Sequence, residues 1–172
     1  MDNTIDLVFS FDTTGSMYPC LTQVRRNVAQ TVDYLFGLIP NLRIGIITHG
    51  DYCDGAEVIT LLDLTANKAA IQKFIKNAPA TDGGDLDEAY ELVLNRARTL
   101  NWTAGKNKAL VMIGDCCPHK VGYKYGGHTN DLDWKNELNL LLESNISVIP
   151  VQALGKQSSV NFYNEIARIS GS

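Results

Sequence analysis

A carboxylate followed by two hydroxyls stands out near the start of the 172-residue chain, in the segment Asp12-Thr13-Thr14-Gly15-Ser16. The apolar run before Asp12 is typical of a strand buried on both faces, and Gly15 allows a tight turn after it. Thr14 and Ser16 can then direct their oxygens to the same side as the carboxylate. Hard oxygen donors of this kind suit Mg²⁺ better than a soft metal.

Two further acidic residues occupy loops that should lie near this turn. Asp115 follows the apolar run of residues 109–113, and Asp85 comes after two glycines in a loop that leads into a helix. In an open α/β sheet, the loops beyond the carboxyl ends of the strands form the rim where ligands bind. We therefore expect one divalent cation, Mg²⁺ or else Mn²⁺ or Ca²⁺, to be held by Asp12, Thr14, Ser16, Asp85 and Asp115.

Alternating strands and helices must position these loops. Strand-length apolar runs occur at residues 5–11, 42–47, 57–62, 109–113 and 146–151. Amphipathic helices are expected at residues 21–36, 69–75, 89–100, 134–142 and 160–169, with Thr65 and Asp131 as N-caps of the second and the fourth. The connection before the third strand is too short for a parallel crossover, which predicts an antiparallel strand at the sheet edge.

This pattern predicts an α/β fold, a doubly wound and mostly parallel sheet with helices on both faces. We expect a single domain over residues 1–172, and a domain excised from a longer protein would show the same pattern. The net charge of −4 and the lack of a long Lys/Arg run argue against nucleic acid as a partner, and no apolar run is long enough for a membrane span. The four cysteines do not form a disulfide scaffold at this length, which favours a reduced, cytoplasmic setting.

With these residues and this order of elements, the chain resembles the von Willebrand factor type A (vWA) domains, the family that includes integrin I domains. The metal-ion-dependent adhesion site (MIDAS) of that family has the pattern Asp-x-Ser-x-Ser, then a Thr, then an Asp. Asp12, Thr14 and Ser16 match the first element, with Thr14 in place of the first Ser, and Asp115 matches the last Asp. The resemblance covers nearly the whole chain. It implies a Rossmann-like vWA fold and a non-enzymatic module that binds a protein partner, or another domain of the same protein, through its metal.

Asp85 departs from the family pattern, because it stands where the family has the Thr. A bacterial and protist branch, which includes vWA domains attached to alpha-kinases, is similar to the chain in this Gly-Gly-Asp form and through Asp115-Cys116-Cys117-Pro118-His119. A third carboxylate at the rim is expected to strengthen cation binding. Since it also neutralises more of the metal's charge, the metal becomes a weaker acceptor for a carboxylate of the partner.

Other polar and aromatic residues of the loops suggest contacts rather than chemistry. The histidines and cysteines do not have the spacing of a structural zinc site, so we interpret them as loop histidines and small buried thiols. Exposed loop aromatics are enriched at interfaces, and Trp134 at helical spacing is expected in the core. The candidates for partner contact are Tyr52, His119, Tyr123 and Tyr125.

A phosphotransfer hydrolase of the haloacid-dehalogenase type is the alternative function. There an Asp at the end of the first strand attacks a phosphate beside Mg²⁺, and Asp12 has that position. Such an enzyme also needs an acid/base Asp two residues later, where this chain has Thr14. The segment after Asp115 lacks the further carboxylate as well, so no catalytic residue is assigned.

Overall fold

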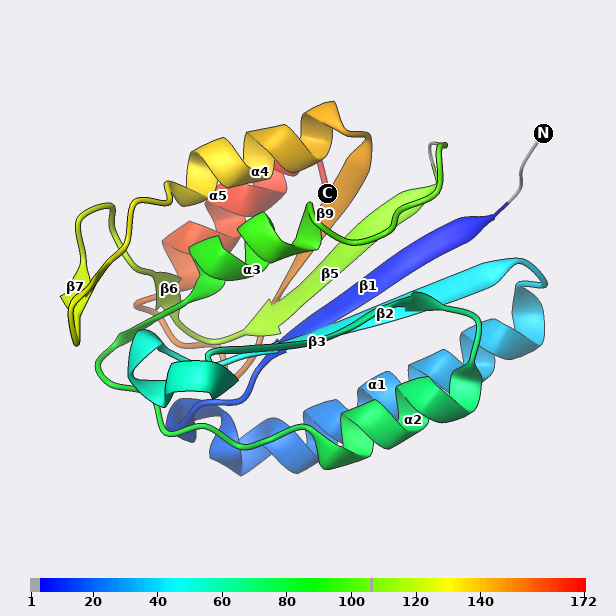
Figure 1. The fold of residues 1–172 in the computed structure, drawn as a ribbon, viewed down its shortest axis with the longest axis horizontal. Helices are drawn as coiled ribbons and strands as arrows, with labels where there is room; N and C mark the ends of the chain where they lie inside the picture. Colours follow the sequence, from blue (N-terminus) through cyan, green and yellow to red (C-terminus); the bar gives the residue numbers. More distant parts are fainter. Residues whose placement is uncertain (1–3, 106) are drawn as a thin grey trace.

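The computed structural model describes residues 4–105 and 107–172, and its centre is a five-stranded sheet (Figure 1). The strand order is β3-β2-β1-β5-β9. All neighbours in the sheet are parallel except β2 and β3, so the prediction of an antiparallel strand at the edge is confirmed. The strands are β1 (Ile5–Asp12), β2 (Leu42–His49), β3 (Ile59–Thr65), β5 (Lys108–Gly114) and β9 (Ile146–Gln152).

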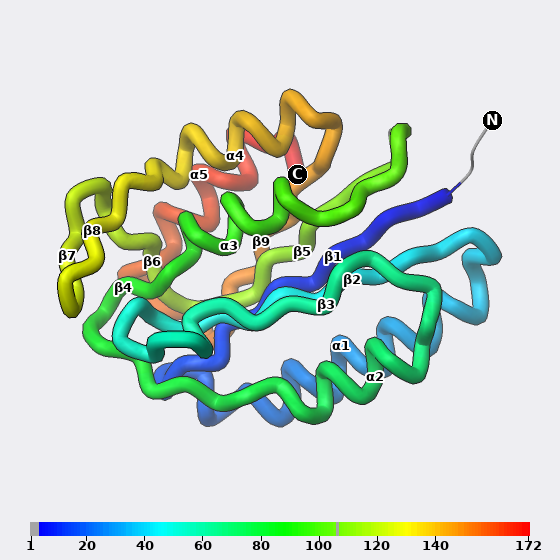
Figure 2. Tube along the Cα trace, viewed as in Figure 1, coloured from blue at the N-terminus to red at the C-terminus, as the bar shows by residue number. Residues whose placement is uncertain are grey.

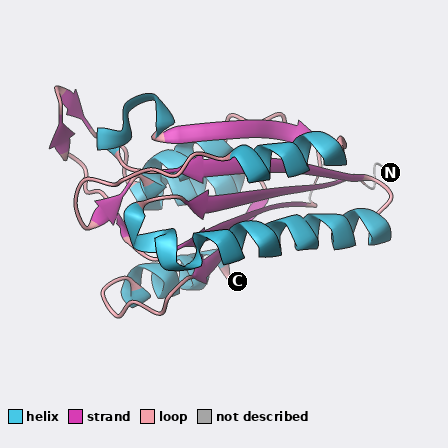
Figure 3. Cartoon of the chain, turned by 90° about the horizontal axis from the view of Figure 1, so that it is seen from below, coloured by secondary structure: helices cyan, strands magenta, loops and turns pink. Residues whose placement is uncertain are grey.

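Helices cover both faces of this sheet, with α1 and α2 on one face and α3, α4 and α5 on the other (Figures 1 and 3). Val8 of β1 packs in the core on the side of α3, α4 and α5, whereas Phe9 and Phe11 pack in the core on the other side. Within the described residues, no helix has the length and apolar character needed to cross a membrane. The helices are α1 (Tyr18–Leu38), α2 (Lys68–Asn77), α3 (Tyr90–Ala97), α4 (Trp134–Glu143) and α5 (Val160–Ser170).

The loops after β1, β2 and β5 gather at one end of the sheet together with several short elements (Figure 2). Strand β4 pairs in parallel with β6, so that Glu88 lies opposite Pro118. This two-residue ladder joins the loop before α3 to the loop after β5. The short elements are the 3₁₀ helices η1 (Gly15–Met17) and η2 (Tyr52–Glu57) and the strands β4 (Asp87–Glu88), β6 (Cys117–Pro118), β7 (Lys124–Tyr125) and β8 (His128–Thr129).

The predicted α/β fold is confirmed, and three local predictions are wrong. The third strand begins later than predicted, because residues 52–57 form η2. Helix α2 is capped by Asn67, whose side chain accepts a hydrogen bond from the Ala70 amide, while Thr65 ends β3. Helix α4 is capped by Asp133, which accepts from the Asn136 amide, rather than by Asp131. In each pair of cap candidates the residue closer to the helix has the side chain in reach.

Candidate metal centre at the rim of the sheet

Asp12, at the end of β1, is buried, and both of its carboxylate oxygens accept hydrogen bonds. Its Oδ1 accepts hydrogen bonds from the amide and the hydroxyl of Thr14, at 2.8 and 2.7 Å. Its Oδ2 accepts one from the hydroxyl of Tyr90 in α3, at 2.7 Å. These bonds hold the carboxylate in one orientation at the rim, with the Thr14 hydroxyl beside it.

Ser16 connects this turn to the loop after β5. Its hydroxyl donates to Oδ1 of Asp115 at 2.8 Å and lies 3.3 Å from Oγ1 of Thr14. Asp115 is also fully buried, and its Oδ2 lies 2.5 Å from Nζ of Lys156, in the loop after β9. The structure therefore brings Asp12, Thr14, Ser16 and Asp115 together, as the sequence predicted, and adds an ammonium group.

Glu88 is a further carboxyl group at this centre, and the sequence analysis missed it. It lies in β4, is 2% exposed, and its Oε2 has no hydrogen-bond partner. A Cβ atom added at Gly83 would lie 2.9 Å from Oε1 of Glu88 and 3.3 Å from Cβ of Thr14, so the Glu88 carboxyl group sits beside the Thr14 side chain. Burial, and then the negative charge of Asp12, raise the pKa of Glu88 to about 9. A cation at this position would relieve both effects.

The Tyr90 hydroxyl connects the loop after β1 to the loop after β5. Besides donating to Asp12, it accepts hydrogen bonds from the amides of Asp115 and Cys116, at 3.1 and 3.3 Å. A Cβ atom at Gly114 would lie 1.9 Å from this hydroxyl oxygen, so residue 114 must be glycine for Tyr90 to reach its partners. One buried phenol thus sets the spacing of Asp12 and Asp115.

Asp85, in contrast, lies in a second group of potential ligands. Its carboxylate is exposed and accepts hydrogen bonds from the Asp87 amide and the Tyr123 hydroxyl, both at 3.0 Å. Its ligand atoms lie within 4.8 Å of those of Asp51 and His119. The structure therefore places Asp85 with Asp51 and His119, not in the group that contains Asp12 and Asp115.

Of the four candidate contact residues, His119 belongs to this second group, Tyr52 and Tyr123 have their rings beside that of His119, and Tyr125 pairs with His128 in the β7–β8 ladder. The rings of His119 and Tyr123 stack at 3.7 Å, and Tyr52 donates its hydroxyl to Glu91 at 2.8 Å. His119 is buried and ion-paired with Asp51, whereas Tyr52 and Tyr123 are half-buried. Tyr125 is the most exposed of the four, at 45%.

The donor atoms around Asp12 fit a hard divalent cation. Carboxylate and hydroxyl oxygens from several loops converge there, and one buried carboxyl oxygen, that of Glu88, has no partner. The Cys116 thiol lies in the same group, but it donates to Asp115 at 3.1 Å. Burial raises the pKa of this thiol to about 12. The thiol is therefore protonated, and a protonated thiol is a poor metal ligand.

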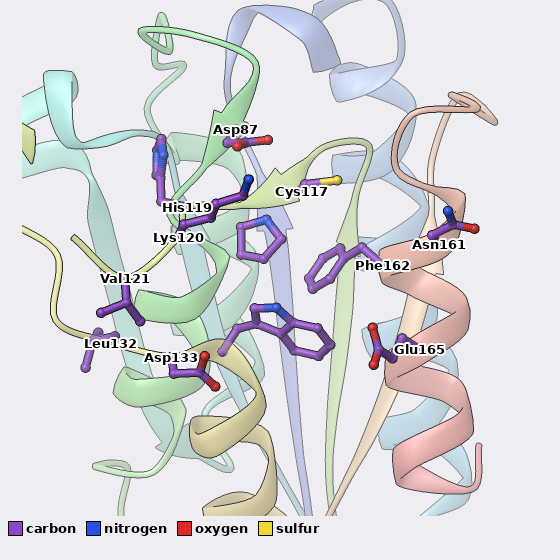
Figure 4. A pocket seen from close by; sticks show the side chains of 12 residues that line it. Asp87, Cys117, His119, Lys120, Val121, Leu132, Asp133, Asn161, Phe162 and Glu165 are labelled. Atoms are coloured by element: carbon purple, nitrogen blue, oxygen red, sulfur yellow. The ribbon is translucent and has the colours of Figure 1, made fainter. Parts of the chain in front are cut away.

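A hollow of about 670 Å³ lies between the loop after β6 and helices α4 and α5 (Figure 4). Asp87, Cys117 and His119 lie at one end of it, and Phe162 and Glu165 of α5 lie at the other. Trp134 packs edge-on against Phe162, with ring centroids 5.1 Å apart, and contacts the core as predicted. The surface of this hollow is mixed, with apolar and charged side chains next to one another.

Some of the missed residues carried a signal in the sequence. Asp12 ends β1, Asp115 directly follows β5, and Asp51 comes two residues after β2. Because ligands bind beyond the carboxyl ends of the strands, the position of Asp51 in the sequence already made it a candidate. Glu88 stands directly before an apolar helix, where a carboxylate is usually a cap. Lys156 had no signal, since only the path of the loop after β9 brings it to the rim.

Comparison with known protein families gives one match. Residues 6–172 match the family model of the von Willebrand factor type A domain. No curated protein is significantly similar in sequence.

Among solved structures, the chain is similar to the pilus adhesin SpaC from Lactobacillus rhamnosus GG in two crystal structures. For the open conformation the TM-score is 0.63 at 17% identity, over 86% of this chain and 23% of the adhesin. For the other form the TM-score is 0.66 at 17% identity, over 87% of this chain and 24% of the adhesin. The chain thus spans about a quarter of the adhesin's length, and the likeness concerns the fold.

Proposed function

Because the chain belongs to the von Willebrand factor type A domain family, we propose that it is a protein-interaction module whose binding depends on a divalent metal. The observation that carries this proposal is the group of buried oxygens at the rim, in which Glu88 keeps an unpartnered oxygen beside Thr14. The residues proposed to hold the cation, directly or through water, are Asp12, Thr14, Ser16, Glu88 and Asp115. Glu88 replaces Asp85 of the sequence-based set.

Mg²⁺, when bound, would supply a positive centre whose shell an oxygen of the partner completes. The chain's own part is to hold the ligands: Tyr90 orients Asp12, and Ser16 orients Asp115. Three carboxyl groups around one dication leave little positive charge for a further anion. We therefore expect the partner to offer a neutral oxygen more readily than a carboxylate.

The bonds of Asp12 support binding rather than hydrolysis. The hydrolase needs an acid/base Asp two residues after its nucleophile, whereas here Thr14 has that position and donates its amide and its hydroxyl to Oδ1 of Asp12. We propose that the module binds a protein partner or another domain of the same protein, and not nucleic acid or a membrane. The proposed setting is the cytoplasm. Membership of the branch with alpha-kinase-associated domains is also proposed, and the Gly83-Gly84-Asp85 loop supports it.

Calorimetric titration with Mg²⁺ and Mn²⁺ tests the metal site. Wild type should bind one ion at the rim, Asp12→Ala should not, and Glu88→Gln should bind at least about tenfold more weakly because it loses a charged ligand. Asp33→Asn is the matched control, since Asp33 is an exposed acid of α1 that pairs with Lys68. No binding by wild type, or equal binding by Asp12→Ala, would refute the proposal.

The interaction itself is tested by affinity capture with wild type and Asp12→Ala as baits, each with Mg²⁺ and with chelator. Partners of the rim should be retained only by wild type in Mg²⁺. Partners that remain in chelator would move the interface elsewhere on the surface. Turnover of a generic phosphomonoester that is lost in Asp12→Asn would support the hydrolase instead.

A further inference from the structure

We propose that Asp51, Asp85 and His119 form a second metal site, which takes a transition-metal dication of the Zn²⁺ class. This site goes beyond the metal of the proposed function, because none of its ligands belongs to the group around Asp12. Each of the three side chains offers one ligand atom, and these atoms lie within 4.8 Å of one another.

The three ligands come from three different loops that the fold brings together. Asp51 follows β2, Asp85 precedes β4, and His119 follows β6 directly. The ladder between β4 and β6 fixes the last two loops side by side. This is why the spacing of these residues along the chain resembles no zinc motif.

The buried half of the site is an Asp51–His119 pair whose 2.6 Å contact would widen to the ligand spacing when a metal replaces the shared proton. Asp51 and His119 are 0% and 2% exposed, and Nε2 of His119 lies 2.6 Å from Oδ1 of Asp51. The carboxylate also accepts from the amides of Tyr52 and Gly84, at 2.6 and 3.0 Å. A Cβ atom at Gly84 would lie 2.7 Å from Oδ2 of Asp51, so only glycine allows the loop to approach this closely.

Neighbouring groups orient the other two ligands. Tyr123 stacks on the ring of His119 at 3.7 Å and donates its hydroxyl to Asp85 at 3.0 Å. Outer hydrogen bonds of this kind hold the ligands of protein metal sites in place. Zn–N and Zn–O distances of about 2.0–2.1 Å place tetrahedral ligands about 3.4 Å apart. Because Asp85 is exposed, it can move the short distance that closes the site.

The chemistry of the ligands selects the class of metal. An imidazole nitrogen with two carboxylates suits Zn²⁺, Co²⁺ or Fe²⁺, whereas the all-oxygen group at Asp12 suits Mg²⁺. Two carboxylates balance the charge of a dication held with a neutral imidazole. Asp85 lies at the edge of a hollow of about 530 Å³ that opens to solvent, so a fourth position is free for water or for a ligand atom of a partner.

The test is a Zn²⁺ titration, followed by calorimetry, in excess Mg²⁺ that saturates the rim site. Wild type should bind one Zn²⁺, and His119→Ala and Asp85→Asn should bind it at least tenfold more weakly. Asp85→Asn also guards against misfolding, because this side chain is exposed. Asp82→Asn, an exposed acid of the same loop, is the matched control and should bind like wild type.

Co²⁺ is the second probe, since its visible spectrum reports its ligands. In the same excess of Mg²⁺, wild type and Asp12→Ala should give the same spectrum, and His119→Ala should lose it. Retention of Zn²⁺ by Asp12→Ala separates this site from the rim, so each of the two proposals can fail without the other. The inference is overturned if wild type takes up no Zn²⁺ in excess Mg²⁺. It is also overturned if His119→Ala and Asp85→Asn bind Zn²⁺ as tightly as wild type.

Discussion

Lys156 is the group whose removal should change cation binding most informatively. Its ammonium lies 2.5 Å from Oδ2 of Asp115, where a metal held by that oxygen would also lie. The Lys156 side chain is 37% exposed, whereas Asp115 is fully buried. Exposed pairs contribute about 0.2–1 kcal/mol and breaking a fully buried pair costs about 3–5 kcal/mol, so this half-exposed pair should contribute about 1–2 kcal/mol.

A bound metal must compete with this ammonium for Asp115, so the free energy of the pair is subtracted from metal binding in wild type. Lys156→Met should therefore bind Mg²⁺ about 5- to 30-fold more tightly, since about 1.4 kcal/mol corresponds to a factor of ten. Without metal, the variant should melt about 2–8 °C lower than wild type, at about 2–4 °C per kcal/mol for a chain of this size. In saturating Mg²⁺ the difference in melting temperature should shrink.

Calorimetric titration at constant ionic strength measures the affinities of wild type and Lys156→Met. Lys135→Met is the matched control, because it makes the same charge change at an ion pair with Glu165, formed between α4 and α5. Tighter Mg²⁺ binding should appear in Lys156→Met alone. If Lys156→Met binds Mg²⁺ no more tightly than the control, the ammonium does not compete with the metal and the reasoning is refuted.

Three further predictions concern groups that hold the fold around the rim and at the opposite end of the sheet. Tyr90→Phe leaves a buried oxygen of Asp12 without its donor and should cost about 1.5–3 kcal/mol in urea unfolding; a smaller loss would show that water replaces the hydroxyl. Arg43→Leu leaves the buried Asp6 without its bidentate partner and should cost about 3–5 kcal/mol, unless the loop of Thr103 moves to compensate. Burial raises the pKa of Asp6, but the hydrogen bonds from Arg43 and Thr103 outweigh burial and hold the pKa below the ordinary value of 3.8. The Asp6 carboxylate therefore stabilises the fold above pH 3.8, and this stabilisation is lost as the pH falls through the lower pKa of the folded state. Unfolding curves from pH 5 to 2 should show this loss in wild type and not in Arg43→Leu.

The fold could be predicted from the sequence because its signals are local. Each strand of the central sheet is an apolar run of strand length, and each helix has apolar residues on one face. The short connection before β3 forces an antiparallel neighbour whatever the rest of the chain does. The errors are also local: an N-cap depends on which of two nearby polar side chains reaches the first free amides, and the sequence does not decide that for Thr65 and Asn67.

The sequence by itself also determined half of the proposed metal site. Asp12, Thr14 and Ser16 lie in one turn, and Asp115 ends up beside them because β1 and β5 are parallel neighbours. Only the tertiary structure decided the other half. Whether Asp85 or Glu88 faces Asp12 depends on the two-residue ladder between β4 and β6, a contact between loops that no periodicity reveals. The same ladder carries Asp85 to His119, and the path of the loop after β9 brings Lys156 to Asp115. Strand ends can be read from the pattern of apolar residues, but the approach of one loop to another is set by packing across the whole domain.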